Sequence, residues 1–390
     1  MTLQEKSIAK HREWAGKIEI VSRAPLDSRE ALSLAYTPGV AAVCKEIEKD
    51  PEESFSLTRR HNLVAVITDG SAVLGLGDIG TKAAMPVMEG KCALFSAFAG
   101  VDAFPLCIAT KDVEQFVETV ALLADSFGGI NLEDIAAPRC FAIEEKLKER
   151  LDIPVFHDDQ HGTAIVVGAA LTNALRVVGK AKDQVKIVIN GAGAAGTAIG
   201  LLLQKMGFPD IILCDKEGAL CAGDPALSPA HATLAERTNP RKEKGSLSEV
   251  IRGKDVFIGV SKAGLVTKEM VESMAKGAIV FPMANPEPEI MPELALEGGA
   301  AVVGTGRSDY PNQINNVLAF PGVFKGALSV RAKTITDEMK VAAAQAIADF
   351  VPGAKLTAFH ILPDAFEEGI ADAVGQAVAE LARKQGLCRI

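Results

Sequence analysis

The chain has 390 residues, of which 48% are hydrophobic and 23% are charged, and its formal net charge is −9. This length and balance indicate a globular protein of two or three domains, because a chain so apolar buries sizeable cores and does not stay disordered. The negative charge argues against a nucleic-acid partner, which requires a basic face.

The composition also bears on location. The stretch from Met1 to Lys10 is polar and has no apolar core, so no signal peptide is visible. The apolar stretch Cys92–Ala109 is interrupted by Asp102 and Pro105, and no segment reaches the roughly 20 apolar residues of a membrane span. The seven cysteines form no CxxC pair and are typical of reduced, mostly buried thiols. We therefore expect a cytoplasmic protein without a membrane partner.

The first part of the chain alternates short apolar runs with helical patterns. Leu63–Thr68 predicts a buried strand, because an apolar and β-branched run ends there at the turn signal Asp69-Gly70. The glycine-dense run Val73–Gly80 indicates a tight crossover. Asp112–Phe127 has apolar residues at helical spacing and is stopped by two glycines, so it predicts a helix.

Strand and helix patterns also alternate in the second part. Val185–Asn190 predicts a strand, Ala195–Met206 a helix, and Ile211–Asp215 the next strand. Further expected elements are the helices 163–178 and Pro363–Gln385, the strands Val256–Val260, Ala278–Pro282 and Ala300–Val303, and an irregular excursion over 216–245. Such alternation produces a doubly wound parallel sheet. We predict an α/β protein with an N-terminal α/β domain at 1–156 and a Rossmann-like domain at 157–390 that includes the C-terminal helix.

A glycine-rich turn follows the strand Val185–Asn190 and reads Gly191-Ala192-Gly193-Ala194-Ala195-Gly196. Gly191 permits the tight turn, Gly193 lets the backbone approach a pyrophosphate, and Gly196 lets the following helix pack closely on the strand. Asp215 ends the next strand, about twenty residues on, where an acid accepts from the adenosine ribose hydroxyls and favours NAD. Lys216 follows at once and could meet a 2′-phosphate, so NADP stays open.

Two pairs of adjacent carboxylates precede this turn, Glu133 with Asp134 and Asp158 with Asp159. Adjacent carboxylates repel, so burying them together costs several kcal/mol unless a cation neutralises them. Oxygen ligands suit Mg²⁺ or Mn²⁺. One alternative is a solvated acidic loop before an ordinary helix. Another is zinc, but the two neighbouring histidines lack the cysteines or the HExxH spacing of zinc sites and fit better as braces for the carboxylates.

Two further side chains are candidates for acid–base chemistry. Lys91 is flanked by glycine, cysteine and apolar residues, and burial near a cation would lower its pKa into the range of a base. The alternative is an exposed lysine. Tyr36 precedes a turn that enters a helix, so its hydroxyl group could point into a cleft; the alternative is a packed tyrosine with a satisfied hydroxyl group.

Together these stretches resemble the malic enzyme family in its small bacterial form, without the phosphotransacetylase-like extension of some relatives. The segments that carry the resemblance appear in family order from about residue 20 to about residue 365. They are Tyr36-Thr37-Pro38-Gly39-Val40-Ala41, Leu74-Gly75-Leu76-Gly77-Asp78-Ile79-Gly80, Pro86-Val87-Met88-Glu89-Gly90-Lys91, Asn131-Leu132-Glu133-Asp134, Phe156-His157-Asp158-Asp159-Gln160-His161-Gly162-Thr163, Ala284-Asn285-Pro286, Gly304-Thr305-Gly306-Arg307-Ser308-Asp309-Tyr310-Pro311-Asn312-Gln313 and Ile314-Asn315-Asn316.

The resemblance implies oxidative decarboxylation of (S)-malate to pyruvate and CO₂, with reduction of NAD or NADP and dependence on Mg²⁺ or Mn²⁺. It makes the first domain catalytic, with Lys91 as the base for the malate hydroxyl group and Tyr36 as the acid that protonates C3. The remaining roles that it implies are metal ligation by Glu133, Asp134 and Asp159, tuning of the lysine by Asp158, and contacts to substrate or nicotinamide by Asn285 and Asn315, with Asn316 as the nearby alternative.

The chain departs from the family pattern in places. Ala72 stands where larger eukaryotic-type enzymes carry an arginine for a substrate carboxylate, so the clamp must come from elsewhere, with Arg307 or a helix N-terminus as candidates. Thr81 replaces a usual proline. The basic stretch after the second strand is altered, which leaves the choice between NAD and NADP open.

Three other functions compete with this interpretation. The malolactic reaction uses the same site but yields lactate. A metal-independent hydroxy-acid or amino-acid dehydrogenase has a similar domain order and does not need four acids before the glycine turn. A nucleotide-sensing module would bind NAD without turning over malate. For the assembly, a homodimer is the default symmetric expectation.

Overall fold

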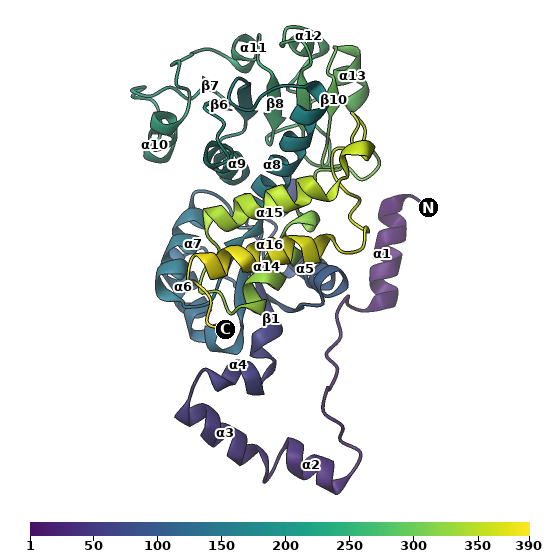
Figure 1. The fold of residues 1–390 in the computed structure, drawn as a ribbon, viewed down its shortest axis with the longest axis vertical. Helices are drawn as coiled ribbons and strands as arrows, with labels where there is room; N and C mark the ends of the chain where they lie inside the picture. The colour runs from purple at the N-terminus through teal and green to yellow at the C-terminus, as the bar shows by residue number, and fades with distance from the viewer.

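Two β-sheets form the body of the protein (Figure 1), and the computed structural model describes residues 1–390 apart from the side chain of Leu74. The first sheet is parallel in the order β2-β1-β3-β4. Its strands are β1 (Leu63–Thr68), β2 (Asp102–Cys107), β3 (Gly129–Leu132) and β4 (Val155–His157). The α/β class predicted from the alternating patterns is confirmed.

The second sheet has the order β10-β9-β8-β5-β6-β7 and is parallel except for the short β7. Its strands are β5 (Lys186–Asn190), β6 (Asp210–Asp215), β7 (Gly218–Ala219), β8 (Val256–Gly259), β9 (Ile279–Pro282) and β10 (Val302–Val303). The chain goes from β5 to β6 on one side and returns to β8 on the other, so the strand order reverses at β5. In doubly wound sheets, ligands bind in the crevice that this reversal opens.

Every strand predicted from an apolar run is present, with ends that agree within two residues. The strand β2 was not predicted, because Asp102 and Pro105 interrupt its pattern. A proline inside a strand removes a ladder donor and is tolerated at a sheet edge, which is where β2 lies. The prediction that Val73–Gly80 forms a crossover is wrong: the segment holds the short η2 (Leu74–Leu76) and a loop, and the crossover is the helix α5 (Thr81–Ala99).

The helix α8 (Asp158–Val178) lies between the two sheets and begins five residues earlier than the predicted 163–178, so both acids of the second pair stand in its first turn. Negative charge there is stabilised by the helix dipole. The helix is 21 residues long and apolar enough to span a bilayer by length and composition, contrary to the expectation that no segment would be. However, 67% of its apolar window is buried within the protein, as in a core helix.

The last helices return to the first sheet. Phe95 of α5 packs edge-on against Phe320 and Phe324 of α14 (Phe320–Ser329), with ring centroids 4.7 and 5.3 Å apart. The helices α15 (Asp337–Phe350) and α16 (Ile370–Lys384) pack against α8 and α14 respectively. One apolar core therefore runs from the first sheet to the C-terminal helices. The predicted division between residues 156 and 157 falls inside β4.

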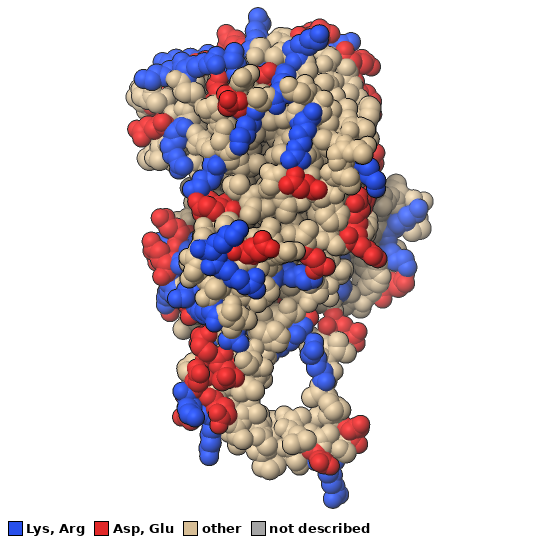
Figure 2. Space-filling model, viewed as in Figure 1, with Lys and Arg blue, Asp and Glu red and all other residues tan. Residues whose placement is uncertain are grey.

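The N-terminal segment stands apart from this body. It contains α1 (Leu3–Trp14), α2 (Arg29–Ala35), α3 (Val40–Lys49) and α4 (Glu53–Leu57), and none of residues 1–54 is buried. We call residues 18–51 the arm. Figures 1 and 2 show it extending from one end of the molecule around an opening.

The remaining helices are shorter or connect the strands of the two sheets. They are η1 (Arg59–Asn62), α6 (Val113–Leu123), η3 (Ala124–Ser126), α7 (Arg139–Arg150), α9 (Ala194–Lys205), α10 (Pro229–Arg237), α11 (Leu247–Val250), α12 (Lys268–Glu272), α13 (Pro292–Glu297), η4 (Asn316–Leu318) and η5 (Gly353–Lys355).

Candidate active site

The two acidic pairs meet at the carboxyl end of the first sheet. Glu133 and Asp134 follow β3, and Asp159 lies in the first turn of α8, directly after β4. Because β3 and β4 are parallel neighbours, their ends lie at the same edge. One carboxylate oxygen from each of Glu133, Asp134 and Asp159 lies within 4.8 Å of the others. The structure thus brings together the three residues predicted to bind a metal.

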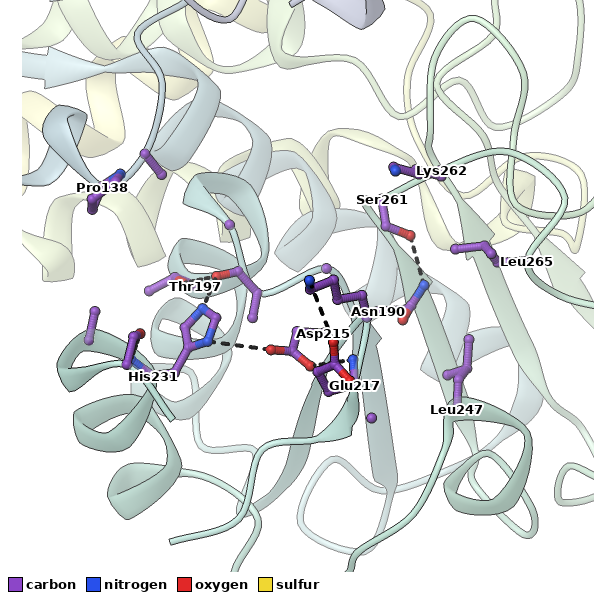
Figure 3. A pocket seen from close by; sticks show the side chains of 18 of the residues that line it. Pro138, Asn190, Thr197, Asp215, Glu217, His231, Leu247, Ser261, Lys262 and Leu265 are labelled. Atoms are coloured by element: carbon purple, nitrogen blue, oxygen red, sulfur yellow. Dashed lines mark hydrogen bonds and ion pairs between the residues drawn. The ribbon is translucent and has the colours of Figure 1, made fainter. Parts of the chain in front are cut away.

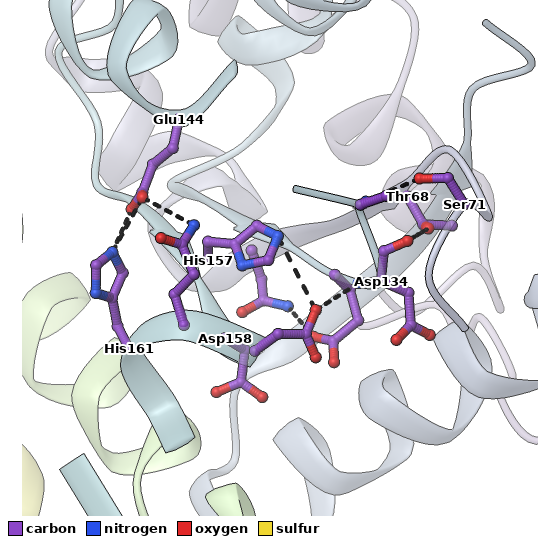
Figure 4. A network of polar contacts seen from close by, with 12 residues as sticks. Thr68, Ser71, Asp134, Glu144, His157, Asp158 and His161 are labelled. Atoms are coloured by element: carbon purple, nitrogen blue, oxygen red, sulfur yellow. Dashed lines mark hydrogen bonds and ion pairs between the residues drawn. The ribbon is translucent and has the colours of Figure 1, made fainter. Parts of the chain in front are cut away.

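The backbone holds this cluster in place. Asp134 has a φ of 54°, a left-handed conformation that Asp tolerates better than most residues, and its N–H donates to Asp159 Oδ2 at 2.7 Å. The Asn131 amide donates to Glu133 Oε2 at 2.8 Å. Figure 4 shows this network with its dashed contacts. Glu133 and Asp134 are buried and Asp159 is partly exposed, so the acids belong to an ordered array and not to a solvated loop.

Lys91 projects from α5 into the same cluster and is only 7% exposed, so the alternative of an exposed lysine is wrong. Its Nζ donates to Asp158 Oδ2 at 2.6 Å and lies 3.0 Å from Glu133 Oε1. The ammonium group also lies 4.3 Å from the centroid of the Phe320 ring. Asn316 donates from Nδ2 to the same Asp158 oxygen at 2.6 Å, so Asp158 is held by two donors.

Burial dominates the electrostatics of these groups. It raises the pKa of Glu133 to about 7 and that of Asp158 to about 7, against the opposing effect of the Lys91 charge, and it raises the pKa of Asp159 to about 6. Burial alone lowers the pKa of Lys91, but the carboxylates of Asp158 and Glu133 raise it by more, so this pKa lies above its ordinary value. The lowered pKa expected for Lys91 is therefore not produced by the protein groups.

The donor set fits a hard divalent cation. One positive charge on Lys91 against four negative charges on Glu133, Asp134, Asp158 and Asp159 leaves the ionised cluster with a net charge of −3. Removing such a charge from water is costly unless a cation compensates it. Carboxylate oxygens from three residues within 4.8 Å of one another are the ligand type that Mg²⁺ and Mn²⁺ prefer.

The neighbouring histidines do not complete a zinc site. His161 Nε2 lies 2.7 Å from Glu144 Oε1 on α7, away from the acidic cluster. His157 is fully buried with Nε2 3.9 Å from Asp159 Oδ2. Burial lowers the pKa of each imidazole to about 4, so both are neutral at pH 7. Only His157 borders the cluster, and neither of its ring nitrogens makes a hydrogen bond to a carboxylate.

Tyr36 lies elsewhere. It ends α2 on the arm, and its side chain is 67% exposed. Figure 1 shows α2 and α3 at the opposite end of the long axis from the second sheet. They lie well below α8, the helix that begins at Asp158. The exposure of Tyr36 excludes the alternative of a packed tyrosine, and the structure does not bring Tyr36 together with the acidic cluster of the same chain.

The two asparagines assigned from the resemblance lie on loops of the second half. Asn285 is exposed. A Cβ on Gly75 would lie 2.5 Å from the backbone carbonyl oxygen of Asn285, so Asn285 lies where the two halves of the chain meet. Asn315 accepts from the Val317 N–H at 3.0 Å and so caps η4. Its neighbour Asn316 makes the contact with Asp158.

A cavity of about 920 Å³ opens at the carboxyl ends of β5 and β8 (Figure 3). The glycine turn forms one wall. Gly191 has a φ of +117°, and a Cβ on Gly196 would lie 1.7 Å from the Gly191 carbonyl oxygen, so both positions require glycine. A Cβ on Gly193 would meet nothing within 4 Å, so its backbone faces open space, as an approaching pyrophosphate requires.

Asp215 lies at the far side of this cavity, at the end of β6. It is joined there by His231 of α10, a residue that no sequence pattern had indicated. His231 Nδ1 lies 3.5 Å from Asp215 Oδ2, and its Nε2 lies 3.2 Å from the carbonyl oxygen of Ala192 in the glycine turn. Lys216 is 88% exposed along its side chain and pairs with Glu217 at 3.5 Å. Lining residues such as Ser246, Ser261 and Lys262 also carried no sequence signal.

The fold and the two sites define a class of protein. A doubly wound sheet with a glycine turn, a cavity at its switch point and a terminal acid is the architecture of a dinucleotide-dependent oxidoreductase. The sequence patterns named "Malic enzyme, N-terminal domain" and "Malic enzyme, NAD binding domain" match residues 15–148 and 160–383. The chain belongs to the malic enzyme family.

Individual relatives agree with this assignment. The chain is 56% identical over 391 residues to the "Bifunctional malic/malolactic enzyme" of Bacillus subtilis, covering 100% of this chain and 95% of the relative. It is 55% identical to the "NAD-dependent malic enzyme" of Geobacillus stearothermophilus, covering 96% and 78%. The crystal structure of malic enzyme from Pyrococcus horikoshii superposes with a TM-score of 0.95 at 47% identity, covering 100% and 92%.

Proposed function

We propose that this chain catalyses the divalent-metal-dependent oxidative decarboxylation of (S)-malate to pyruvate and CO₂, with reduction of NAD or NADP. The observation that carries the proposal is the buried Lys91 in contact with Asp158 and Glu133, beside the three clustered carboxylates. A metal-independent dehydrogenase or a nucleotide sensor has no use for four clustered acids, three of them buried, beside a lysine. We assign the catalytic role to residues 1–156 and dinucleotide binding to residues 157–390.

Glu133, Asp134 and Asp159 would hold Mg²⁺ or Mn²⁺. When bound, the cation supplies a Lewis acid that polarises the C2 oxygen and a positive charge that offsets the carboxylates around Lys91. The three residues come from two adjacent strand ends on a rigid sheet, which keeps the site preorganised.

Lys91 is assigned as the base for the malate C2 hydroxyl group, whose proton its neutral form would accept; a bound dinucleotide would take up the hydride from C2. Asp158 holds the Nζ atom in place through a 2.6 Å hydrogen bond and is itself held by Asn316. Positioning of this kind matters because general-base catalysis requires hydrogen-bond contact with the proton to be removed. From the family resemblance we assign to Tyr36 the proton that C3 takes up after CO₂ leaves, although its side chain stands exposed on the arm, away from Lys91 of the same chain.

We propose NAD as the preferred cofactor. The supporting observation is Asp215, whose carboxylate lines the cavity where the adenosine ribose would lie and would repel a 2′-phosphate. Lys216, the residue that could favour NADP, is exposed and paired with Glu217. Related enzymes of both kinds exist, since the chain is also 47% identical to the "NADP-dependent malic enzyme" of Escherichia coli, covering 95% of this chain and 51% of that protein.

A second candidate function is the malolactic conversion of malate to lactate. It is favoured by the Bacillus subtilis relative, whose name includes both activities. The two reactions differ in their redox balance: oxidative decarboxylation leaves NADH in solution, whereas the malolactic reaction consumes it again.

Initial rates with malate and Mn²⁺, with NAD and NADP side by side, test the proposal directly. We expect absorbance at 340 nm to rise in step with pyruvate, faster with NAD than with NADP. Lactate formation without net NADH would replace the main proposal with the second candidate. Undiminished activity in EDTA would remove the metal from the mechanism.

Two variants separate the roles of the site residues. Lys91→Ala should abolish turnover while dinucleotide binding survives, as measured by the change in NADH fluorescence on binding. Loss of both would remove Lys91 from acid–base chemistry. Asp134→Ala should remove activity and metal dependence together. A cytoplasmic location and a homodimeric assembly complete the proposal.

A further inference from the structure

The imidazole of His231 is an ordered part of the wall of the dinucleotide cavity. His231 is the third residue of α10, and its backbone N–H donates to the Ser228 hydroxyl oxygen at 3.2 Å, which caps the helix. Leu234 and Ala235 on the same helix are buried, so α10 is fixed to the core. The His231 side chain, in contrast, is 29% exposed and lines the cavity.

The ring lies between the two elements that recognise a dinucleotide (Figure 3). Its Nε2 lies 3.2 Å from the Ala192 carbonyl oxygen in the glycine turn, and its Nδ1 lies 3.5 Å from Asp215 Oδ2 at the end of β6. A carbonyl oxygen only accepts hydrogen bonds, so Nε2 carries the single ring hydrogen of a neutral imidazole. The lone pair of Nδ1 then points to the side of the ring where Asp215 lies.

The two neighbouring acceptors, His231 Nδ1 and Asp215 Oδ2, lack a donor. Among the described residues, neither atom accepts a hydrogen bond, because the Glu217 N–H donates to the other oxygen, Asp215 Oδ1, at 2.8 Å. The adenosine ribose of NAD brings two hydroxyl donors to this end of the cavity. In NADP a phosphate stands at the 2′ position and offers acceptors instead. The pair of acceptors therefore suits the diol of NAD.

We propose that His231 is a second specificity-determining residue of the dinucleotide site. Its Nδ1 accepts a hydrogen bond from the ribose 2′-hydroxyl group, beside Asp215, which accepts from the neighbouring hydroxyl group. The same lone pair repels the oxygens of a 2′-phosphate, as the carboxylate does. The inference rests on the proposed function, in which Asp215 favours NAD, and deepens it by adding an uncharged group that distinguishes the two cofactors.

Phosphate binding is the rival role for this wall of the cavity, because a helix N-terminus attracts anions. The first turn of α10 is poorly equipped for it. Its first residue is Pro229, which has no N–H, and the N–H of His231 is already bonded to Ser228. The charge of Asp215, 3.5 Å from the ring, also opposes a phosphate there.

The dissociation constants of NADH and NADPH test the assignment without malate, through the change in cofactor fluorescence on binding. His231→Asn and His231→Gln both replace the ring by one amide. The shorter asparagine places its amide near the position of Nδ1, whereas the longer glutamine places it near Nε2. Because loss of one hydrogen bond changes a dissociation constant by about 2- to 10-fold, the ratio of the NADPH to the NADH constant should fall by about this factor in His231→Gln.

The same ratio should keep its wild-type value in His231→Asn, because an acceptor remains near the Nδ1 position. Glu236→Gln is the control, since Glu236 is exposed on the same helix and should leave both constants unchanged. A ratio that stays at the wild-type value in His231→Gln overturns the inference. A larger loss of affinity for NADPH than for NADH in either His231 variant identifies a phosphate ligand and overturns it as well.

An analogue of NAD without the 2′-hydroxyl group distinguishes direct contact from support of the glycine turn. By calorimetry, 2′-deoxy-NAD should bind to wild type and to His231→Gln with equal affinity, whereas NAD should bind more tightly to wild type. Equal losses for NAD and for the analogue would show that the ring only supports the glycine turn, which overturns the inference.

Failure of the proposed function would appear in other measurements. Wild-type protein that binds the dinucleotides in the expected pattern but does not oxidise malate would overturn the proposed reaction and support the role of His231. Wild-type protein that binds NADPH more tightly than NADH would overturn the proposed cofactor preference together with this inference.

Discussion

Gly162→Ala is a substitution whose effect follows directly from the geometry of the catalytic lysine. Gly162 lies four residues after Asp158 on α8 and therefore on the same face of the helix. A Cβ at position 162 would lie 1.8 Å from Asp158 Oδ1, and Asn316 Cβ would stand 3.2 Å away on the other side. Because real Cβ atoms essentially never approach another atom closer than 3.0 Å, the carboxylate must move by at least about 1.2 Å.

That movement breaks the contacts of Lys91. The Asp158 oxygen that Lys91 and Asn316 share lies 2.6 Å from each donor, and a shift of about 1.2 Å takes it beyond hydrogen-bond distance. Breaking a buried ion pair costs about 3–5 kcal/mol, while replacing a helical glycine by alanine returns about 1 kcal/mol. We expect a net loss of roughly 2–4 kcal/mol in stability, and misplacement of the base by about 1 Å should lower kcat about 100-fold.

Gly168→Ala is the matched control on the same helix. A Cβ there would meet Met206 Sδ at 2.7 Å, but a thioether on a flexible side chain can move away. The midpoint temperature of thermal unfolding and the steady-state rate with malate, Mn²⁺ and NAD should therefore change little for Gly168→Ala. Both should fall sharply for Gly162→Ala. Wild-type kcat in Gly162→Ala would refute the assignment of Asp158 as the group that positions Lys91.

Three further predictions concern the dinucleotide half. Asp215→Ser removes the charge that repels a 2′-phosphate, so the ratio of kcat/KM for NADP to that for NAD should rise by about tenfold or more; an unchanged ratio contradicts this role. In Gly196→Ala the new Cβ would lie 1.7 Å from the Gly191 carbonyl oxygen, so the KM for NAD should rise at least about tenfold. In the control Gly200→Ala the nearest atom is a leucine methyl group at 3.2 Å, which can move, so the KM should stay unchanged. Glu289 is buried and accepts from two backbone N–H groups, one at each carboxylate oxygen, at 2.8 and 3.0 Å. Because an amide NH₂ group cannot accept, Glu289→Gln should lower the free energy of unfolding in urea by about 1–3 kcal/mol; wild-type stability would contradict this role for the second oxygen.

Local sequence determined the sheets and the dinucleotide site. Runs such as Leu63–Thr68 and Ile211–Asp215 form strands where they were predicted, because β-branched and apolar side chains favour strands buried on both faces. The glycine turn could also be predicted from the sequence. Its positions require glycine because a Cβ would collide with backbone atoms a few residues away along the chain. The adjacent acids at two strand ends also predicted the carboxylate cluster.

Tertiary structure decided which side chains share a site and which do not. The contact between Asn316 and Asp158 joins residues 158 positions apart, and His231 reaches both Asp215 and the glycine turn from a segment that looked irregular. The packing of the last helices against α5 could not be predicted from local patterns either. Such patterns indicate which face of a helix is apolar but not which element packs against that face. For the same reason the sequence could name Tyr36 as a candidate acid, while only the fold reveals that the tyrosine stands on an arm remote from the lysine of its own chain.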